Sequence, residues 1–172
     1  MSPELNPWFA LTILGDPRLW AGLCVILFFV RVYYKKKTSP YNKKFLWVSA
    51  FIIFAGFAMA SGLLVSEGLK EIFQVPRICS IETNPYCLSN YSFPSGHTTV
   101  AFIAFSGVYF ILNRKEYLWV FILPVLVGVS RLALGVHTIL DVAAGGSLGI
   151  LVFFVFYWAS KKTEFVGRWT KR

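Results

Sequence analysis

Five long apolar runs restrict what this 172-residue sequence can fold into. Each run approaches the roughly 20 residues with which a helix crosses about 30 Å of hydrocarbon. The composition agrees, because 56% of the residues are hydrophobic and only 15% are charged. We therefore predict an all-α integral membrane protein, a bundle of about five transmembrane helices. The candidate spans are residues 17–34, 45–65, 94–112, 117–134 and 138–160.

The N-terminal segment, residues 3–14, is too short to cross the hydrocarbon. It places Trp8 and Phe9 beside polar neighbours, so we expect a helix in the membrane interface. The span that follows has no Ala-x-Ala-like cleavage site, and we expect it to be retained. Since no repeat or long linker divides the sequence, we predict one transmembrane domain over residues 1–172.

The net charge of +9 is unevenly distributed along the chain. Lysines and arginines follow the first, third and fifth spans, which is the positive-inside pattern. We therefore expect the N-terminus outside, the C-terminus in the cytoplasm, and residues 66–93 and 130–137 on the outer side. No soluble domain is present to carry a basic groove, so we do not expect a nucleic-acid partner.

Two cysteines, Cys79 and Cys87, fall in the same predicted outer loop, in a compartment that permits disulfides. We expect a bridge between them. A metal site is the alternative, but no His, Asp or third Cys lies near them in the sequence.

The motif Pro94-Ser95-Gly96-His97 precedes the third apolar run. Proline suits the first turn of a helix, and glycine lets a ligand approach the backbone closely. The free N–H groups and the helix dipole then favour a phosphate group. Taken alone, the motif fits two interpretations equally well: an anion-binding site, or a plain interfacial helix cap with a solvated histidine.

A second group of polar residues contains Arg131, His137 and Asp141. On a helix, His137 and Asp141 would share a face, and the carboxylate would fix the imidazole tautomer. Alternatively, Asp141 is a first-turn acid that complements the helix dipole. Only four residues, 113–116, join the third and fourth spans, so these helices should be antiparallel neighbours with positions 97 and 130 close together.

The long outer connection carries Lys70 and Arg77, seven positions apart. A continuous helix would place both on one face, although Pro76 should end the helix just before Arg77. Alternatively, these cations are simple interfacial anchors.

Together these residues match the needs of phosphoryl transfer. Fixed cations and backbone N–H groups would hold the nonbridging oxygens. One histidine would attack phosphorus while the other protonates the leaving oxygen. The outer segments lack the carboxylate clusters that hold magnesium, so we expect neither a metal nor another cofactor.

The order and spacing of these residues resemble the three-part signature of the type 2 phosphatidic acid phosphatase (PAP2) family of membrane lipid phosphatases, which is related to bacterial acid phosphatases. One position departs from the pattern, because Ile78 follows Arg77 where the family usually has proline. The resemblance implies an acid-phosphatase-like helical bundle. It also implies that His137 forms a phosphohistidine, that Asp141 orients it, and that His97 is the general acid and later the base. The residues it assigns to phosphate binding are Lys70, Arg77, Ser95, Gly96 and Arg131.

The same resemblance implies a lipid phosphate or diphosphate as substrate, at the outer face of a bacterial inner membrane. We favour lipid A 1-phosphate, with undecaprenyl diphosphate and phosphatidylglycerophosphate as alternative substrates. Two further classes of protein would share part of the pattern, namely a catalytically silent lipid-binding or scrambling protein and a vanadate-dependent peroxidase. Five apolar spans argue against the peroxidase. We expect a monomer, because one bundle contains every proposed catalytic residue.

Overall fold

The computed structural model describes residues 6–37, 43–112 and 115–162, and every regular element in these ranges is a helix. This confirms the predicted all-α class. The α-helices are α1 (Pro7–Ile13), α2 (Pro17–Lys37), α3 (Lys43–Phe73), α4 (Gly96–Leu112), α5 (Ile122–Ala133) and α6 (Ile139–Lys162). A 3₁₀ helix, η2 (Lys115–Phe121), leads directly into α5.

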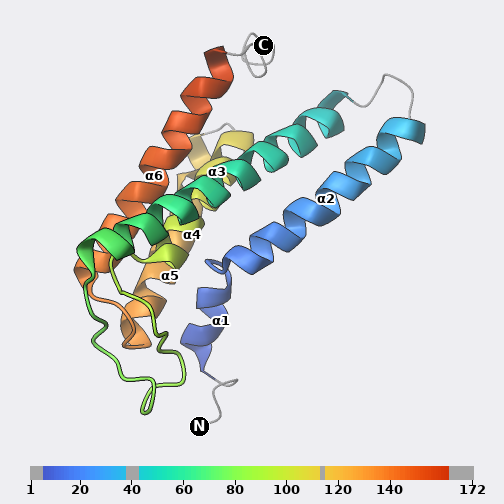
Figure 1. The fold of residues 1–172 in the computed structure, drawn as a ribbon. Coiled ribbons are helices and arrows are strands. Elements are labelled where there is room, and N and C mark those ends of the chain that lie inside the picture. Colours follow the sequence, from blue (N-terminus) through green and yellow to red (C-terminus); the bar gives the residue numbers. More distant parts are fainter. Residues whose placement is uncertain (1–5, 38–42, 113–114, 163–172) are drawn as a thin grey trace.

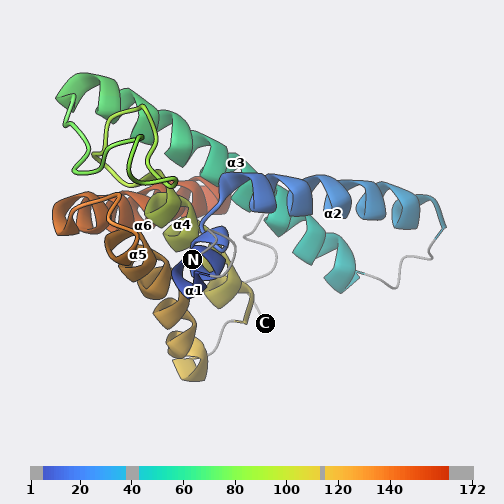
Figure 2. The same ribbon diagram turned by 90° about the horizontal axis from the view of Figure 1, so that it is seen from below.

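Helix α4 lies at the centre of the bundle, in contact with α3, α5 and α6 (Figure 1). Its Val100, Ala101 and Ile103 are fully buried, and Phe102 packs against Gly146 of α6. Helix α2 extends away from this group, whereas α1 lies across the lower end beside α5 (Figure 2). The predicted N-terminal helix is therefore present, and the α4–α5 contact agrees with the predicted antiparallel pair.

Two glycines of α6 allow α4 to approach closely. A Cβ atom on Gly145 would lie 2.5 Å from the Ser95 carbonyl oxygen, and one on Gly149 would lie 2.6 Å from that of Thr99. Real Cβ atoms do not approach an oxygen so closely, so only glycine fits at these positions. Small residues are the usual means by which membrane helices bring their backbones together. These contacts fix the start of α4 against the first turns of α6.

Two stretches of the described residues, Lys115–Ala133 and Ile139–Ala159, are long and apolar enough to cross a membrane. The pair Pro7–Ile13 and Pro17–Val30, bent by 43°, would make a third. Helix α4 is apolar but has only 17 residues. The chain is thus a membrane protein with helical spans, whereas the count of five stays a prediction. The orientation also stays a prediction, because most of the basic residues behind it lie outside the described side chains.

The long connection between α3 and α4 folds back over the lower end of the bundle (Figure 1). Helix α3 ends at Phe73, and Gln74 takes a positive φ of 48°. A disulfide joins Cys79 to Cys87, and the Tyr86 ring stacks on that of Phe9 in α1. The disulfide therefore cross-links two parts of the connection, and the ring contact holds the connection against α1.

We expect Gly149→Val to destabilise the protein by about 1–3 kcal/mol, because the added side chain must push α4 away from α6. Gly22→Val is the matched control, since a Cβ atom on Gly22 of α2 would meet nothing within 4 Å. The measurement is the thermal unfolding midpoint of each variant in detergent. Equal midpoints for the two variants would contradict the proposed packing.

Candidate active site

The predicted site residues come from four segments that meet at the lower end of the bundle. Lys70 lies in the last turn of α3 and Arg77 in the loop that follows. An Arg77 nitrogen, Nη1, lies 3.3 Å from Nε2 of His137, in the connection between α5 and α6. The Ser95 N–H, just before α4, donates to the Asp141 carbonyl oxygen at 3.0 Å. The fold therefore brings together residues that lie up to 71 positions apart in the sequence.

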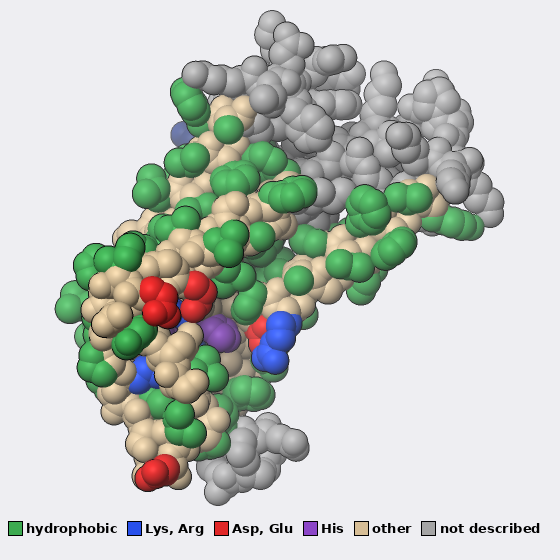
Figure 3. Space-filling view, viewed as in Figure 1, with side chains coloured by type: hydrophobic (Ala, Val, Ile, Leu, Met, Phe, Trp, Pro, Cys, Tyr) green, Lys and Arg blue, Asp and Glu red, His purple; other side chains and the backbone are tan. Residues whose placement is uncertain are grey.

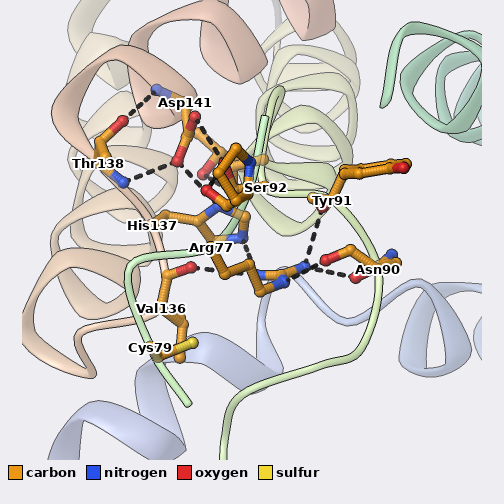
Figure 4. A network of polar contacts seen from close by, with 12 residues as sticks. Arg77, Cys79, Asn90, Tyr91, Ser92, Val136, His137, Thr138 and Asp141 are labelled. Carbon is orange, nitrogen blue, oxygen red and sulfur yellow. Dashed lines mark hydrogen bonds and ion pairs between the residues drawn. The ribbon is translucent and has the colours of Figure 1, made fainter. Parts of the chain in front are cut away.

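The imidazole of His137 is almost completely buried, with 3% of the residue exposed. Its Nε2 faces Arg77, whose guanidinium has only donors, so Nε2 must be the acceptor. The ring proton then belongs on Nδ1, which lies 3.4 Å from Oδ2 of Asp141 (Figure 4). Burial lowers the pKa of His137 well below its ordinary value, and the charge of Arg77 lowers it further. At neutral pH the ring is therefore neutral and carries a lone pair on Nε2.

The carboxylate of Asp141 is fixed by the start of α6. Its Oδ2 accepts from the Thr138 N–H at 2.8 Å, and the Asp141 N–H donates to Thr138 Oγ1 at 3.2 Å. This is a reciprocal capping box. The Ser92 hydroxyl donates to the other carboxylate oxygen at 3.4 Å. The structure thus supports both interpretations of Asp141, because the group that caps the helix also faces His137.

Arg77 is held by the loop in which it lies rather than by a helix. Its Nε and Nη2 donate to the carbonyl and side-chain oxygens of Asn90, at 2.9 and 2.6 Å. Its Nη1 donates to the Val136 carbonyl at 3.0 Å. Helix α3 ends four residues before Arg77, earlier than Pro76 predicted, so Lys70 and Arg77 do not share a helix face. Nevertheless, the loop aims the guanidinium at His137 (Figure 4).

The first turn of α4 presents backbone donors. The Thr99 N–H donates to the Ser95 carbonyl oxygen and begins the helical ladder, so the N–H groups of residues 96–98 lie ahead of it. A Cβ atom on Gly96 would lie 4.0 Å from Lys70 Nζ and 3.8 Å from the hydroxyl of Ser66. Glycine therefore leaves open the space between the helix end and Lys70, where an anion is favoured.

Two further cations are buried beside this space. Lys70 and Arg131 are each only 4% exposed. Lys70 is paired with Glu67, and Arg131 donates to the Thr12 hydroxyl of α1 at 2.9 Å. Among the described residues, the buried Nε of Arg131 has no hydrogen-bond partner. Buried cations are costly unless they are paired, so this cluster favours an anionic ligand.

His97 is the more exposed of the two histidines, and its backbone packs against the bend between α1 and α2. A Cβ atom on Gly15, in that bend, would lie 2.7 Å from the His97 carbonyl oxygen. In the space-filling view, a histidine is accessible in a hollow between acidic and basic side chains (Figure 3). A partly exposed histidine near a buried one suits an acid–base group that exchanges protons with solvent.

Sequence reasoning missed the residues that hold the predicted ones in place. Thr138 had a readable signal, because Thr-x-x-Asp is a capping-box pattern. Thr12 lies 119 positions from Arg131, and no local pattern connects them. The other missed partners are Asn90 on Arg77, Ser92 on Asp141 and Glu67 on Lys70. No group of three or more His, Cys, Asp or Glu that could hold a metal occurs in the described part of the chain.

Three curated proteins are similar to parts of the chain. The bacitracin transport permease protein of Bacillus licheniformis is 41% identical over 76 residues, which cover 44% of this chain and 36% of the relative. Phosphatidylglycerophosphatase B of Bacillus subtilis is 38% identical over 77 residues, which cover 39% of this chain and 38% of that protein. The undecaprenyl-diphosphatase of Sulfolobus acidocaldarius is 26% identical over an alignment that covers 68% of this chain and 65% of that protein. The chain thus spans little more than a third of the first two relatives.

A solved structure covers most of the chain. The transmembrane PAP2-type phosphatidylglycerolphosphate phosphatase from Bacillus subtilis superimposes with a TM-score of 0.70 at 28% identity, over 94% of this chain and 79% of that one. The family model described as PAP2 superfamily matches residues 51–164, more than half of the chain and the segment that contains every predicted site residue. The chain therefore belongs to the PAP2 superfamily.

Proposed function

We propose that this protein is a phosphatase that removes phosphate from a membrane lipid phosphate or diphosphate. The observation that carries the proposal is the neutral, buried His137, whose Nε2 lies 3.3 Å from Nη1 of the Arg77 guanidinium, so that a fixed cation stands beside the nucleophilic nitrogen. A phosphoryl group bound by Arg77 would have its phosphorus within reach of Nε2. Family membership and the two named phosphatases among the relatives support the same reaction.

In the first step, His137 Nε2 attacks phosphorus and the bond from phosphorus to the leaving oxygen breaks. Lys70, Arg77, Arg131 and the N–H groups around Ser95 and Gly96 hold the nonbridging oxygens, where charge accumulates. His97 donates its proton to the leaving oxygen, and the product is a phosphohistidine.

In the second step, His97 takes a proton from water as the water oxygen attacks phosphorus. The phosphorus–nitrogen bond breaks, its electrons return to Nε2, and inorganic phosphate leaves. Asp141 assists both steps from the opposite nitrogen, because its carboxylate keeps the proton on Nδ1 and stabilises the positive charge of the phosphorylated ring. No step requires a metal ion.

For the choice of substrate, we give more weight to the named activities of the relatives than to the preference for lipid A drawn from the sequence. None of these relatives is named as a lipid A phosphatase, whereas one acts by name on phosphatidylglycerophosphate and another on undecaprenyl diphosphate. We therefore propose these two lipid classes ahead of lipid A. We also propose that the enzyme is a monomer in a bacterial plasma membrane, with its site at the outer face, as the lysine distribution indicates.

The purified protein in detergent with EDTA should release phosphate from phosphatidylglycerophosphate or undecaprenyl diphosphate at least about tenfold faster than from lipid A. Vanadate should block the release, because it occupies a phosphate site. Colorimetric phosphate measurement on these three lipids gives the answer. If none of them yields phosphate, the proposed activity is wrong, and if lipid A is the fastest, the substrate class is wrong.

His137→Asn should lower kcat by about 1,000-fold or more, because it removes the nucleophile. The same substitution at His97 removes the proton donor, and its effect should be smaller for a substrate with an acidic leaving group such as p-nitrophenol. The readout is kcat on a lipid phosphate and on p-nitrophenyl phosphate. A His137→Asn variant with normal turnover would remove the nucleophile assignment.

Asp141→Asn should lower kcat by about 100-fold or more with little change in KM, because the neutral amide can still cap the helix but cannot stabilise a positive imidazole. Thr138→Val is the control. It removes the hydroxyl that accepts from the Asp141 N–H and leaves the carboxylate in place. Equal losses of kcat in both variants would show that Asp141 acts only as a helix cap.

A further inference from the structure

Near its C-terminal end, α3 carries a completely buried serine, Ser66, which is 0% exposed. Its hydroxyl has no hydrogen-bond partner among the residues that the structure describes. Other buried hydroxyls on these helices donate to a carbonyl of the preceding turn, as Ser130 does to Val127 at 2.7 Å and Thr99 to Ser95 at 3.1 Å. Within the described ranges, Ser66 therefore lacks the partner that a buried helical hydroxyl ordinarily has.

The Ser66 hydroxyl faces the space at the start of α4. The Cβ position of Gly96 lies 3.8 Å from Ser66 Oγ and 4.0 Å from Lys70 Nζ. Ser66 and Lys70 are four positions apart on α3, so their side chains lie on the same face of that helix. The hydroxyl and the ammonium group therefore border the same space beside Gly96, which is where the phosphate is expected.

An acceptor oxygen in this space would satisfy the hydroxyl. The 3.8 Å separation is about 1 Å longer than an O–H···O hydrogen bond, so an oxygen slightly nearer to α3 than the Gly96 Cβ position would accept from Ser66. The neighbouring groups, the Lys70 ammonium and the N–H groups of residues 96–98, are donors. The buried Nε of Arg131 is a further donor without a partner in the described part of the chain. A phosphate oxygen would supply the acceptor that these donors lack.

We propose that Ser66 is a further phosphate-binding residue, whose hydroxyl donates a hydrogen bond to a nonbridging oxygen of the substrate phosphate beside Lys70 and Gly96. This inference rests on the proposed phosphatase function and adds a residue that the sequence motifs do not include. The unpaired hydroxyl costs stability in the free protein, and the bound phosphate offsets that cost. Because charge accumulates on the nonbridging oxygens during phosphoryl transfer, the bond also strengthens in the transition state.

Ser66→Ala removes the hydroxyl and little else, so it separates phosphate binding from structural support. In the free protein, the thermal unfolding midpoint in detergent should stay level or rise, because a buried hydroxyl without a partner is lost. A serine that stabilises the fold would give the opposite result. A clearly lower midpoint for Ser66→Ala would therefore overturn the proposal.

The same variant should bind orthovanadate about tenfold or more weakly than the unmodified protein, because a hydrogen bond to a charged ligand is lost. Its kcat/KM for phosphatidylglycerophosphate should fall by a similar factor. Ser106→Ala is the matched control, since Ser106 is a buried serine of α4 that lies about 15 Å along the helix from Gly96. Orthovanadate affinity in this control should stay within about twofold of the unmodified protein.

Orthovanadate affinity, measured from the rise of the unfolding midpoint with orthovanadate concentration, does not depend on turnover. Equal affinities for Ser66→Ala and the unmodified protein would overturn the Ser66 assignment and leave the phosphatase function standing. Weaker binding by Ser66→Ala, in a protein that releases phosphate from none of the three lipids, would sustain the Ser66 assignment and reject the phosphatase function. An unmodified protein that does not bind orthovanadate would overturn the assignment as well.

Discussion

The close approach of α4 to α6 is the constraint on which the site depends. Because Gly145 has no side chain, the Ser95 carbonyl can lie against α6 and the Ser95 N–H can donate to the Asp141 carbonyl. That bond joins the anion-binding start of one helix to the first turn of another, where the Asp141 side chain faces His137. The proposed phosphate-binding and nucleophilic halves of the site are thus held together by backbone atoms, which a rigid helix pair places accurately.

The second constraint is electrostatic. Lys70 and Arg131 are buried at the end of an apolar bundle, and Arg77 is half-buried beside them. Lys70 is paired with Glu67, but the partners of the two arginines are neutral: Asn90 and Val136 oxygens for Arg77, and the Thr12 hydroxyl for Arg131. These oxygens orient the cations without neutralising them. The positive charge of the arginines is therefore available for the proposed phosphate, and the charge of Arg77 adds to burial in keeping the pKa of His137 low.

The sequence sufficed to predict the helical class, the disulfide pair and the group of residues around Arg77, His97 and His137, because short motifs encode local chemistry. It did not predict what holds these residues. Thr12 meets Arg131 only through the tertiary packing of α1 on α5, and Asn90 meets Arg77 only once the loop has closed on itself. The sequence led us to favour lipid A, whereas the named relatives support the alternative lipids better.

Detection of the covalent intermediate tests the central claim most directly. If His137 is the nucleophile, rapid acid-free quenching of the protein with a phosphorus-labelled lipid phosphate should trap one phosphoryl group on Nε2 of His137, visible by ³¹P NMR and by peptide mapping. With p-nitrophenyl phosphate, whose leaving group needs little help from an acid, the His97→Asn variant should accumulate it, because the water that hydrolyses it lacks a base. Phosphate release from an active protein without any phosphohistidine, or with the label on another residue, would contradict the account.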